Sequence, residues 1–232
     1  MTCERRLASL LERYSLPPRA GAQLAALAEL LSKDPDAATT VRAPGRVHDD
    51  HLADALAGLE LEQLRAASSI ADLGSGAGVP GLPLAIALPH AQVTLVESNG
   101  RKHAFIERAL SVCGIANAEA VHARAETWTE GRDGNDVVTA RALAPLPVVA
   151  EYAAPLLRVG GALVVWRGRR DDLEEAAATR AASELGLQPS EPLAVNPYAQ
   201  ARHRHLHVMT KIAPTPARFP RRPGVARKRP LG

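Results

Sequence analysis

The chain has 232 residues, of which 46% are hydrophobic and 23% are charged. No apolar run approaches the roughly 18 uninterrupted residues that a membrane-spanning helix needs. The length also excludes a disulfide-dependent mini-protein, since a chain of this size can bury a substantial core. We therefore expect a soluble globular protein with one large domain, or one domain with an appended lobe.

The N-terminal sequence MTCERRLASLLERY carries charges through its first turns and lacks the continuous apolar stretch of a secretory signal. This predicts a cytoplasmic protein, in which Cys3 and Cys113 need no disulfide. Two cysteines alone do not build a zinc site either, so both are expected to be free thiols.

The formal net charge of +3 is distributed unevenly along the chain. Residues 1–191 carry 19 Lys and Arg against all 25 acidic residues, a net charge of −6, whereas residues 192–232 carry 9 basic residues and no acid, a net charge of +9. Such asymmetry predicts either a C-terminal region that binds a polyanion, most commonly nucleic acid, or a tail that only aids solubility.

Residues 1–66 have a helical pattern. Leucines recur at helical spacing within residues 7–14, 24–31 and 52–59, and the Pro- and Gly-containing stretch 33–47 predicts a loop. The pattern therefore predicts an N-terminal helical lobe over residues 1–66.

From Ser69 onward, short apolar runs alternate with helical stretches. The expected strands are residues 69–74, 92–97, 117–121, 135–140 and 161–166. The expected helices are residues 80–88, 99–114, 145–157 and 171–186. This alternation predicts a parallel, doubly wound sheet with right-handed crossovers, which residues 187–195 and 203–212 close as an antiparallel hairpin. The resulting α/β domain spans residues 67–212.

Residues 213–232 form the last predicted segment. They contain 5 prolines, which cannot continue a helix or a central strand, so we expect an extended, mobile, basic arm. Because the predicted ligand site lies upstream in the sheet, we expect the arm to be independent of it.

The sequence Asp72-Leu73-Gly74-Ser75-Gly76-Ala77-Gly78-Val79-Pro80-Gly81 lies between a predicted strand and a predicted helix. Glycines let the backbone turn sharply and approach a ligand closely, and the following helix points its N–H groups toward that ligand. Glu97 ends the second strand 21 residues after Gly76, near the spacing expected of a carboxylate that binds the ribose hydroxyls of a nucleotide.

Three interpretations of this loop compete: a dinucleotide site, a site for S-adenosylmethionine, and a purely structural turn. A pyrophosphate favours a loop without a nearby negative charge, whereas Asp72 immediately precedes the glycines. An anionic strand end suits the cationic sulfonium and amino group of S-adenosylmethionine better. The loop and the order of elements therefore favour a class I methyltransferase fold.

Further motifs follow along the chain. They are ESNGRK at 97–102, RAE at 124–126, ARA at 140–142, RG at 167–168, RHL at 204–206 and FPRRPG at 219–224, the last followed by Lys228 and Pro230-Leu231. With the glycine-rich loop, they resemble the bacterial small-subunit (16S) ribosomal RNA guanine-N7 methyltransferases, once called glucose-inhibited division protein B. The resemblance runs from about His51 to the C-terminus.

The resemblance implies an enzyme that transfers a methyl group from S-adenosylmethionine to N7 of a guanine in 16S ribosomal RNA. We also expect a monomer that binds no metal. Together, the loop chemistry and the resemblance predict cofactor contacts at Asp72, Gly74, Gly76, Gly78, Val79, Glu97, Ala125, Glu126 and Arg141. Arg141 follows the fourth strand, so it is also the candidate catalytic residue, acting by positioning. The residues expected to bind RNA are Arg167, Arg204, Arg218, Arg221, Arg222 and Lys228.

The sequence departs from the family pattern in several places. The family carries W-N-x-x-x-N-L-[TS] in the N-terminal loop, where residues 34–40 read DPDAATT. Ala55 stands where the family has Ser after Asp54, Leu143 where it has an aromatic residue, and Arg167 where it has Lys. The resemblance therefore covers cofactor binding more completely than recognition of the base.

The predicted chemistry demands little of the protein. Guanine N7 has an available lone pair and carries no proton, so the enzyme needs to align the reactants and exclude water rather than supply a general base. Two metal-like patterns, His48-Asp49-Asp50-His51 and the alternating His203, His205 and His207, are interpreted as structural. Two alternatives remain open, an NAD(P)-dependent oxidoreductase and a non-catalytic RNA-binding assembly factor.

Overall fold

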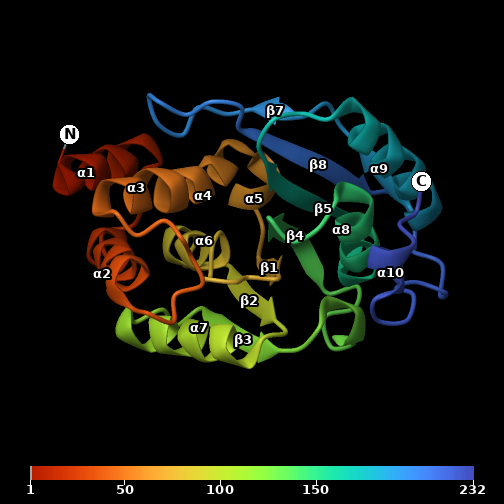
Figure 1. The fold of residues 1–232 in the computed structure, drawn as a ribbon, viewed down its shortest axis with the longest axis horizontal. Helices are drawn as coiled ribbons and strands as arrows, with labels where there is room; N and C mark the ends of the chain where they lie inside the picture. The colour runs from red at the N-terminus through yellow and green to blue at the C-terminus, as the bar shows by residue number, and fades with distance from the viewer. Residues whose placement is uncertain (1) are drawn as a thin grey trace.

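The computed structural model describes residues 2–232, which build a mixed eight-stranded sheet (Figure 1). The strands are β1 (Ser69–Leu73), β2 (Gln92–Glu97), β3 (Ala118–His122), β4 (Asn135–Arg141), β5 (Leu157–Arg167), β6 (Leu187–Pro189), β7 (Leu193–Ala194) and β8 (His205–Lys211). Their order is β3-β2-β1-β4-β5-β8-β6, with β7 also paired to β8. Strands β1 to β5 are parallel, whereas β8 runs antiparallel to β5, β6 and β7. The predicted doubly wound sheet with an antiparallel closing hairpin is confirmed.

Ten α-helices are distributed before, between and after the strands within residues 2–232. They are α1 (Cys3–Arg13), α2 (Ala20–Lys33), α3 (Pro44–Val47), α4 (Asp54–Leu56), α5 (Glu62–Arg65), α6 (Gly81–Ala87), α7 (Gly100–Val112), α8 (Leu146–Ala153), α9 (Asp172–Leu185) and α10 (Val225–Lys228). A π-helical turn, η1 (His48–Ala53), connects α3 to α4. Short 3-10 turns are η2 (Ala57–Glu60), η3 (Ala125–Thr127) and η4 (Ala154–Leu156).

Local capping explains where several of these helices begin. Asn99 accepts the amides of the first turn of α7, and Asp171 does the same for α9. The N-terminal loop was predicted to extend to residue 47, but α3 already begins at Pro44. A proline is favourable at the first position of a helix because its fixed φ suits the helix and no N–H is needed there.

Helices cover both faces of the sheet and bury two separate hydrophobic clusters. Figure 1 shows α1, α2, α3, α4, α6 and α7 on one side, and α8, α9 and α10 on the other. The first cluster joins the N-terminal helices to α6, α7 and one face of the sheet, so the N-terminal lobe shares a core with the sheet. The second cluster lies between the opposite face and helices α8 and α9.

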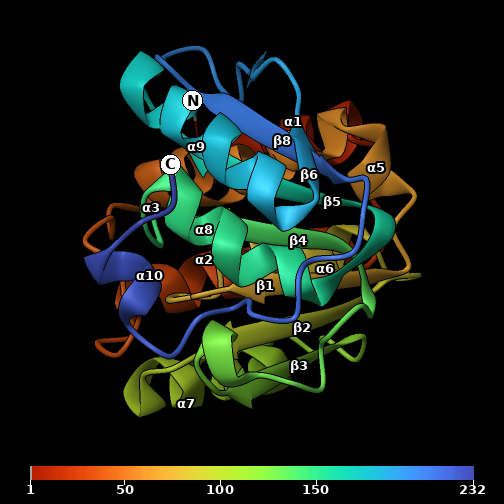
Figure 2. The ribbon, with the colours of Figure 1, turned by 90° about the vertical axis from the view of Figure 1, so that its right-hand side faces the viewer.

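The carboxyl ends of the parallel strands lie at one edge of the molecule. In Figure 2 this edge is on the left, where α3 and α10 also lie. The N-terminal lobe and the C-terminal segment therefore flank the strand ends from opposite faces of the sheet. In such sheets ligands bind outside the carboxyl ends of the strands, so this edge is where a site is expected.

The C-terminal segment is packed, which corrects the prediction of an extended, mobile arm. Phe219 is 2% exposed and Ala226 is 1% exposed, and both belong to the hydrophobic cluster of α8 and α9. Prolines prevent the segment from joining the sheet, but they do not prevent apolar burial of the side chains between them.

A buried ion pair also anchors this segment. The Glu151 carboxylate, on α8, is 1% exposed and accepts the backbone N–H of Arg221 at 3.0 Å. It also accepts Nε of Arg221 at 2.9 Å and Nη2 at 2.5 Å. These charge-assisted bonds raise the pKa of Arg221, so its guanidinium is committed to the fold.

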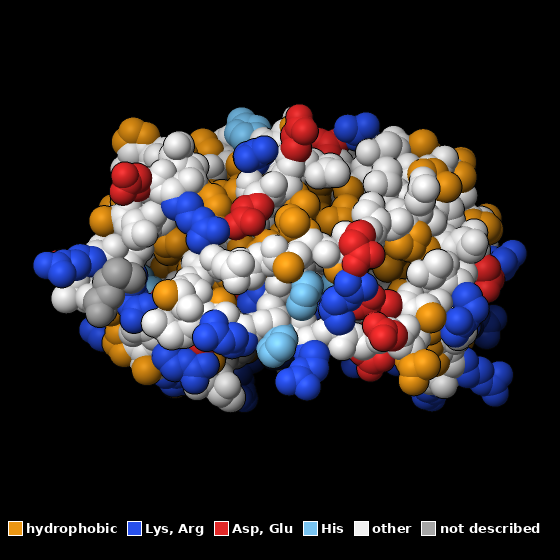
Figure 3. Space-filling model, turned by 90° about the horizontal axis from the view of Figure 1, so that it is seen from above, with side chains coloured by type: hydrophobic (Ala, Val, Ile, Leu, Met, Phe, Trp, Pro, Cys, Tyr) orange, Lys and Arg blue, Asp and Glu red, His pale blue; other side chains and the backbone are white. Residues whose placement is uncertain are grey.

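The charge asymmetry of the sequence does not produce a separate basic arm. The space-filling view shows Lys and Arg side chains at several separated places, interspersed with Asp and Glu (Figure 3). Within residues 2–232, no helix combines the length and apolarity that crossing a membrane requires.

We predict that Arg221→Ala lowers the free energy of unfolding by about 3 kcal/mol, because it leaves the Glu151 carboxylate buried without a counter-charge. Denaturant unfolding of the purified protein measures this. The matched control is Arg222→Ala, since the neighbouring Arg222 is exposed. Equal stability of the two variants would contradict the role given to the ion pair.

Candidate active site

The glycine-rich loop after β1 adopts backbone angles that favour glycine. Gly74, Gly76 and Gly78 have φ of +63°, +60° and +77°, in the left-handed region that other residues rarely adopt. The loop is held against β2, because the Gly74 N–H donates to the carbonyl of Val96 at 2.8 Å. A Cβ at Gly74 would lie 2.4 Å from Cδ1 of Leu143, so a side chain there would also require Leu143 to move.

Asp72 lies beneath the loop. Its side chain has no exposed surface, and its carboxylate accepts Oγ1 of Thr139 at 2.8 Å and the Gly81 N–H at 3.2 Å. Burial raises the pKa of Asp72 to about 6, although these hydrogen bonds oppose the shift. The carboxylate is therefore held by β4 and by the residue that begins α6, and its contact with a cationic ligand stays a prediction.

Glu97 closes the loop from the neighbouring strand. Its Oε2 accepts the Gly76 N–H at 2.9 Å, and its Oε1 accepts the Asn99 N–H at 2.8 Å. The residue is 5% exposed. Each carboxylate oxygen has a second lone pair, so the group is able to accept a further hydroxyl while it supports the loop.

The loop geometry fits the methionine and ribose parts of an adenosylmethionine. A Cβ at Gly76 would have no neighbour nearer than 3.7 Å, which leaves space above the loop for a ligand to approach the backbone. Val79, in the same loop, is 5% exposed and belongs to the core beneath it. The acids Asp72 and Glu97 supply the negative potential that a cationic ligand requires.

The C-terminal segment contacts two parts of this site, which contradicts the expectation that it is independent of it. Oε1 of Glu126, beside Ala125 in η3, accepts the Gly224 N–H at 3.2 Å. Nη2 of Arg227 donates to the carbonyl of Leu143 at 3.0 Å. Since Leu143 packs against Gly74, the segment supports the glycine-rich loop indirectly.

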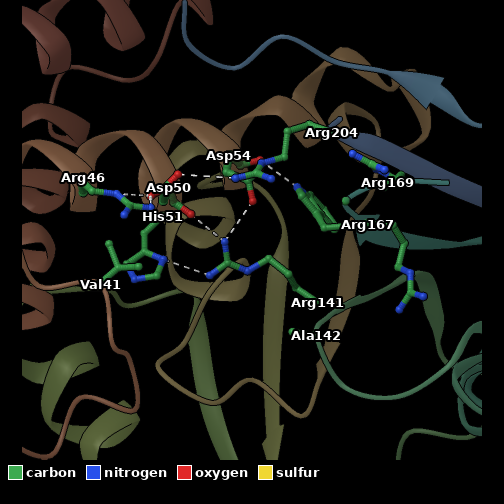
Figure 4. A pocket seen from close by; sticks show the side chains of 12 residues that line it. Val41, Arg46, Asp50, His51, Asp54, Arg141, Ala142, Arg167, Arg169 and Arg204 are labelled. Carbon is green, nitrogen blue, oxygen red and sulfur yellow. Dashed lines mark hydrogen bonds and ion pairs between the residues drawn. The ribbon is translucent and has the colours of Figure 1, made fainter. Parts of the chain in front are cut away.

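Arg141, at the end of β4, points toward the N-terminal lobe (Figure 4). Its Nη1 donates to Oδ2 of Asp54 at 3.0 Å and to the carbonyl of Asp50 at 2.9 Å, and its Nη2 lies 3.1 Å from Nδ1 of His51. Asp54 also lies 3.2 Å from Nε of Arg204. Burial raises the pKa of Asp54, and the charge of Arg141 opposes that shift.

His51 is a neutral member of this network. Burial, together with the charge of Arg141, lowers its pKa to about 4. Because Arg141 can only donate, Nδ1 of His51 must accept, so Nε2 carries the proton and donates to Oγ1 of Thr39 at 2.7 Å. Both ring nitrogens are therefore occupied, and His51 is not a free general base.

A pocket of 480 Å³ opens beside Arg141, between the N-terminal lobe and the ends of β4 and β5. Its lining includes Arg46, Arg141, Arg167, Arg169 and Arg204 together with Asp50 and Asp54. The structure thus brings Arg141, Arg167 and Arg204 together.

The other residues predicted to bind RNA lie apart from this pocket, in the C-terminal segment. Arg218 pairs with Glu184 at 3.3 Å, and Arg221 is held by Glu151. Arg222 and Lys228 are exposed.

Other candidates from the sequence have structural roles. Among residues 2–232, no group of three or more His, Cys, Asp and Glu side chains is arranged to hold a metal ion. His48 lies 2.8 Å from the carbonyl of Pro44, and His205 lies 2.8 Å from that of Gly168. Trp166 is 5% exposed, and its Nε1 donates to the carbonyl of Asp54 at 2.8 Å, so it supports the wall of the pocket.

Comparison with known proteins identifies the family. Residues 22–206 match the family described as rRNA small subunit methyltransferase G. The chain belongs to this family. It is 41% identical over 196 residues to the ribosomal RNA small subunit methyltransferase G of Rubrobacter xylanophilus, covering 82% of this chain and 75% of that protein. It is 42% identical over 198 residues to that of Chloroflexus aggregans, covering 83% and 82%.

Solved structures confirm the fold of this rRNA methyltransferase. Fibrillarin of Aeropyrum pernix, with natively bound S-adenosyl-L-methionine, aligns with a TM-score of 0.54 at 17% identity, covering 68% of this chain and 73% of that one. The ribosomal protein L11 methylase of Lactobacillus delbrueckii aligns with a TM-score of 0.55 at 16% identity, covering 78% and 84%. The protein is therefore an S-adenosylmethionine-dependent rRNA methyltransferase, and the oxidoreductase alternative is wrong.

Sequence reasoning missed the partners that hold Arg141. Asp54, Asp50 and His51 are 87, 91 and 90 residues away from it in the chain. Asp50 and His51 belong to a pattern interpreted above as structural, and nothing in that pattern indicates a contact with Arg141. It also missed Thr139, whose hydroxyl holds Asp72, and Arg46 and Arg169 in the pocket. The alternation of β4 places Thr139 and Arg141 on the same side of the strand, which was the one available signal.

We predict that Asp72→Asn changes how stability depends on pH. An Asp with a raised pKa stabilises the fold below the unfolded pKa of about 4, and that contribution is lost as the pH rises through about 6. Between pH 5 and pH 8 the parent should therefore lose about 1.5 kcal/mol more stability than Asp72→Asn. Urea unfolding at both pH values measures this difference, and parallel curves for the two proteins would refute the assignment.

Proposed function

We propose that the enzyme transfers a methyl group from S-adenosylmethionine to N7 of a guanine in 16S ribosomal RNA. The observation that carries this proposal is Arg141, which ends β4 where the glycine-rich loop and the arginine-lined pocket meet. A nucleotide bound at the pocket would present its base to the cofactor across this residue. The relatives named above act on small-subunit rRNA, which supports the same substrate, and we expect the enzyme to act as a cytoplasmic monomer.

The chemistry of the pocket agrees with N7 as the acceptor atom. N7 attacks the methyl carbon with its own lone pair, the methyl–sulfur bond breaks, and no proton has to be removed first. The one imidazole that lines the pocket, His51, has both nitrogens engaged. An arginine beside the base is able to donate a hydrogen bond to O6 of guanine, which leaves the lone pair of the neighbouring N7 free to attack. Rate enhancement would then come from alignment and exclusion of water.

In this proposal the cofactor lies over the glycine-rich loop. The backbone of Gly74, Gly76 and Gly78 approaches it closely, and Glu97 accepts its ribose hydroxyls. Ala125 and Glu126 lie beside the adenine, while Asp72 supplies charge from beneath the loop. Arg141 is a positioning residue that is shared between cofactor and base.

The proposal is tested by incubating the enzyme with deproteinised 16S rRNA and S-adenosylmethionine labelled in the methyl group. N7-methylguanine is identified by chain cleavage at alkali-labile sites and by mass spectrometry of nucleosides. A label found at another atom or another base would refute the assignment. No incorporation into either free rRNA or purified 30S subunits would favour the non-catalytic assembly factor.

We predict that Arg141→Lys lowers kcat at least tenfold at saturating RNA, because a lysine cannot keep the planar contacts to Asp54 and Asp50. Single-turnover methyl transfer measures this. The second variant is Asp54→Asn, which keeps Arg141 but removes the charge that holds its guanidinium in place. It should also lower kcat. Unchanged single-turnover rates in both variants would remove Arg141 from the site.

A further inference from the structure

The arginine-lined pocket contains more donors than the protein itself uses. Arg141 and Arg204 have side chains that are 19% and 32% exposed, and Arg167 is 25% exposed. Each is held by an acid: Arg141 and Arg204 by Asp54, and Arg167 by Glu174. Their positions are therefore fixed before any ligand arrives.

Each of these three arginines nevertheless keeps an unused donor. Nε of Arg141, Nη1 of Arg204 and Nε of Arg167 have no protein acceptor within residues 2–232. None of these atoms is sealed from solvent, because the single buried side-chain atom without a partner in that range is Nε of Arg6. The pocket thus presents N–H groups that await an acceptor.

The acidic residues of the pocket do not cancel the positive charge of its arginines. Asp50 and Asp54 have side chains that are only 11% and 9% exposed, and both are covered by guanidinium groups. Arg46, by contrast, is 70% exposed, and Arg169 is exposed on the loop after β5. An incoming group therefore meets the more exposed guanidinium groups before the carboxylates. Figure 4 shows these side chains around the pocket.

Geometry and charge together indicate an anion. Five arginines in one pocket favour phosphate, because the planar guanidinium matches two phosphate oxygens and is desolvated more easily than an ammonium group. A volume of 480 Å³ is within the range of small-molecule pockets and exceeds what a lone ion needs. Arg141 and Ala142 line it, and the next residue, Leu143, contacts the glycine-rich loop, so its occupant lies next to the cofactor.

We propose that this pocket binds the phosphate groups flanking the target nucleotide of the RNA, with Arg46 and Arg169 as the outer contacts and Arg141, Arg167 and Arg204 as the inner ones. The proposal rests on the function proposed above and specifies how its substrate is held. This proposal adds RNA contacts at the edge where the strands end, and among the predicted contacts in the C-terminal segment it excludes Arg221, which is committed to Glu151.

The test uses the full chain with the two outer arginines replaced. Arg46→Ala/Arg169→Ala should raise the KM for deproteinised 16S rRNA at least fivefold and leave kcat within twofold of the parent. The slope of log affinity against log salt should become shallower by roughly 0.7 to 0.9 for each phosphate that an arginine no longer neutralises. The matched control is Arg132→Ala, an exposed arginine outside the pocket, which should leave both values unchanged. Equal KM values for the control and the double variant would overturn the proposal.

A competition experiment identifies the group that is bound. Guanosine 5′-monophosphate and guanosine carry the same base, so stronger inhibition of methyl transfer by the monophosphate reports a phosphate contact. That difference should disappear in the double variant. Equal inhibition by both compounds in the parent would overturn the phosphate assignment.

Two controls keep the proposal separate from folding and from the proposed function. Arg169→Ala alone removes a side chain that has no hydrogen-bond or ion-pair partner within residues 2–232, so its melting temperature and affinity for S-adenosylmethionine should match the parent. An unchanged KM in this folded variant and in Arg46→Ala would also overturn the proposal. If the parent methylates an atom other than guanine N7, the proposed function fails. The KM and salt results then still show whether the pocket binds RNA phosphates.

Discussion

The site depends on one buried carboxylate, that of Asp54. It lies in the N-terminal lobe, where it accepts Arg141 from the end of β4 at 3.0 Å and faces Arg204, just before β8, at 3.2 Å. Its own backbone carbonyl accepts Trp166, near the end of β5, at 2.8 Å. Three strand ends are thereby gathered around a single residue of a different lobe. Burial raises the pKa of Asp54 and the charges of Arg141 and Arg204 oppose the shift, so both arginines stabilise the ionised carboxylate.

Other buried acidic residues also hold distant segments of the chain together, through different partners. Glu151 holds the C-terminal segment through Arg221, and that segment in turn contacts Glu126 and Leu143 at the cofactor side. Asp72 has no arginine partner within residues 2–232 and is held by a hydroxyl and an amide. Burial raises its pKa, and these hydrogen bonds and the charge of Arg141 only partly oppose the shift, so its charge is costly to bury. In the proposed function, a cationic cofactor over the loop would stabilise this charge further when it binds.

Local signals explain which features the sequence predicted. Alternating apolar runs and glycines identified the strands, the order of elements and the loop at Gly74, Gly76 and Gly78, because these depend on neighbouring residues. Contacts between distant segments leave no such signal: Glu151 and Arg221 are 70 residues apart, and Glu126 and Gly224 are 98 apart. Prolines correctly excluded regular structure after β8, apart from the single turn of α10, but proline content does not report on apolar burial. The direction in which Asp72 points was equally invisible, since it depends on Thr139 in another strand.

In the proposed function, Arg141 contacts both the cofactor and the target base, and the arrangement of its hydrogen bonds explains how one residue can do so. Arg141 donates three hydrogen bonds within the protein and keeps its Nε–H free, so its position is fixed without exhausting its capacity to bind a ligand. A nucleophile that brings its own lone pair needs alignment above all, and alignment is most precise when the aligning group is immobile before the substrate arrives. His51 is neutral and makes a hydrogen bond through each ring nitrogen, so it adds to this rigidity without adding a positive charge that would repel a sulfonium. In the proposed function, the N-terminal lobe would therefore contribute to catalysis by holding in place an arginine that belongs to the sheet.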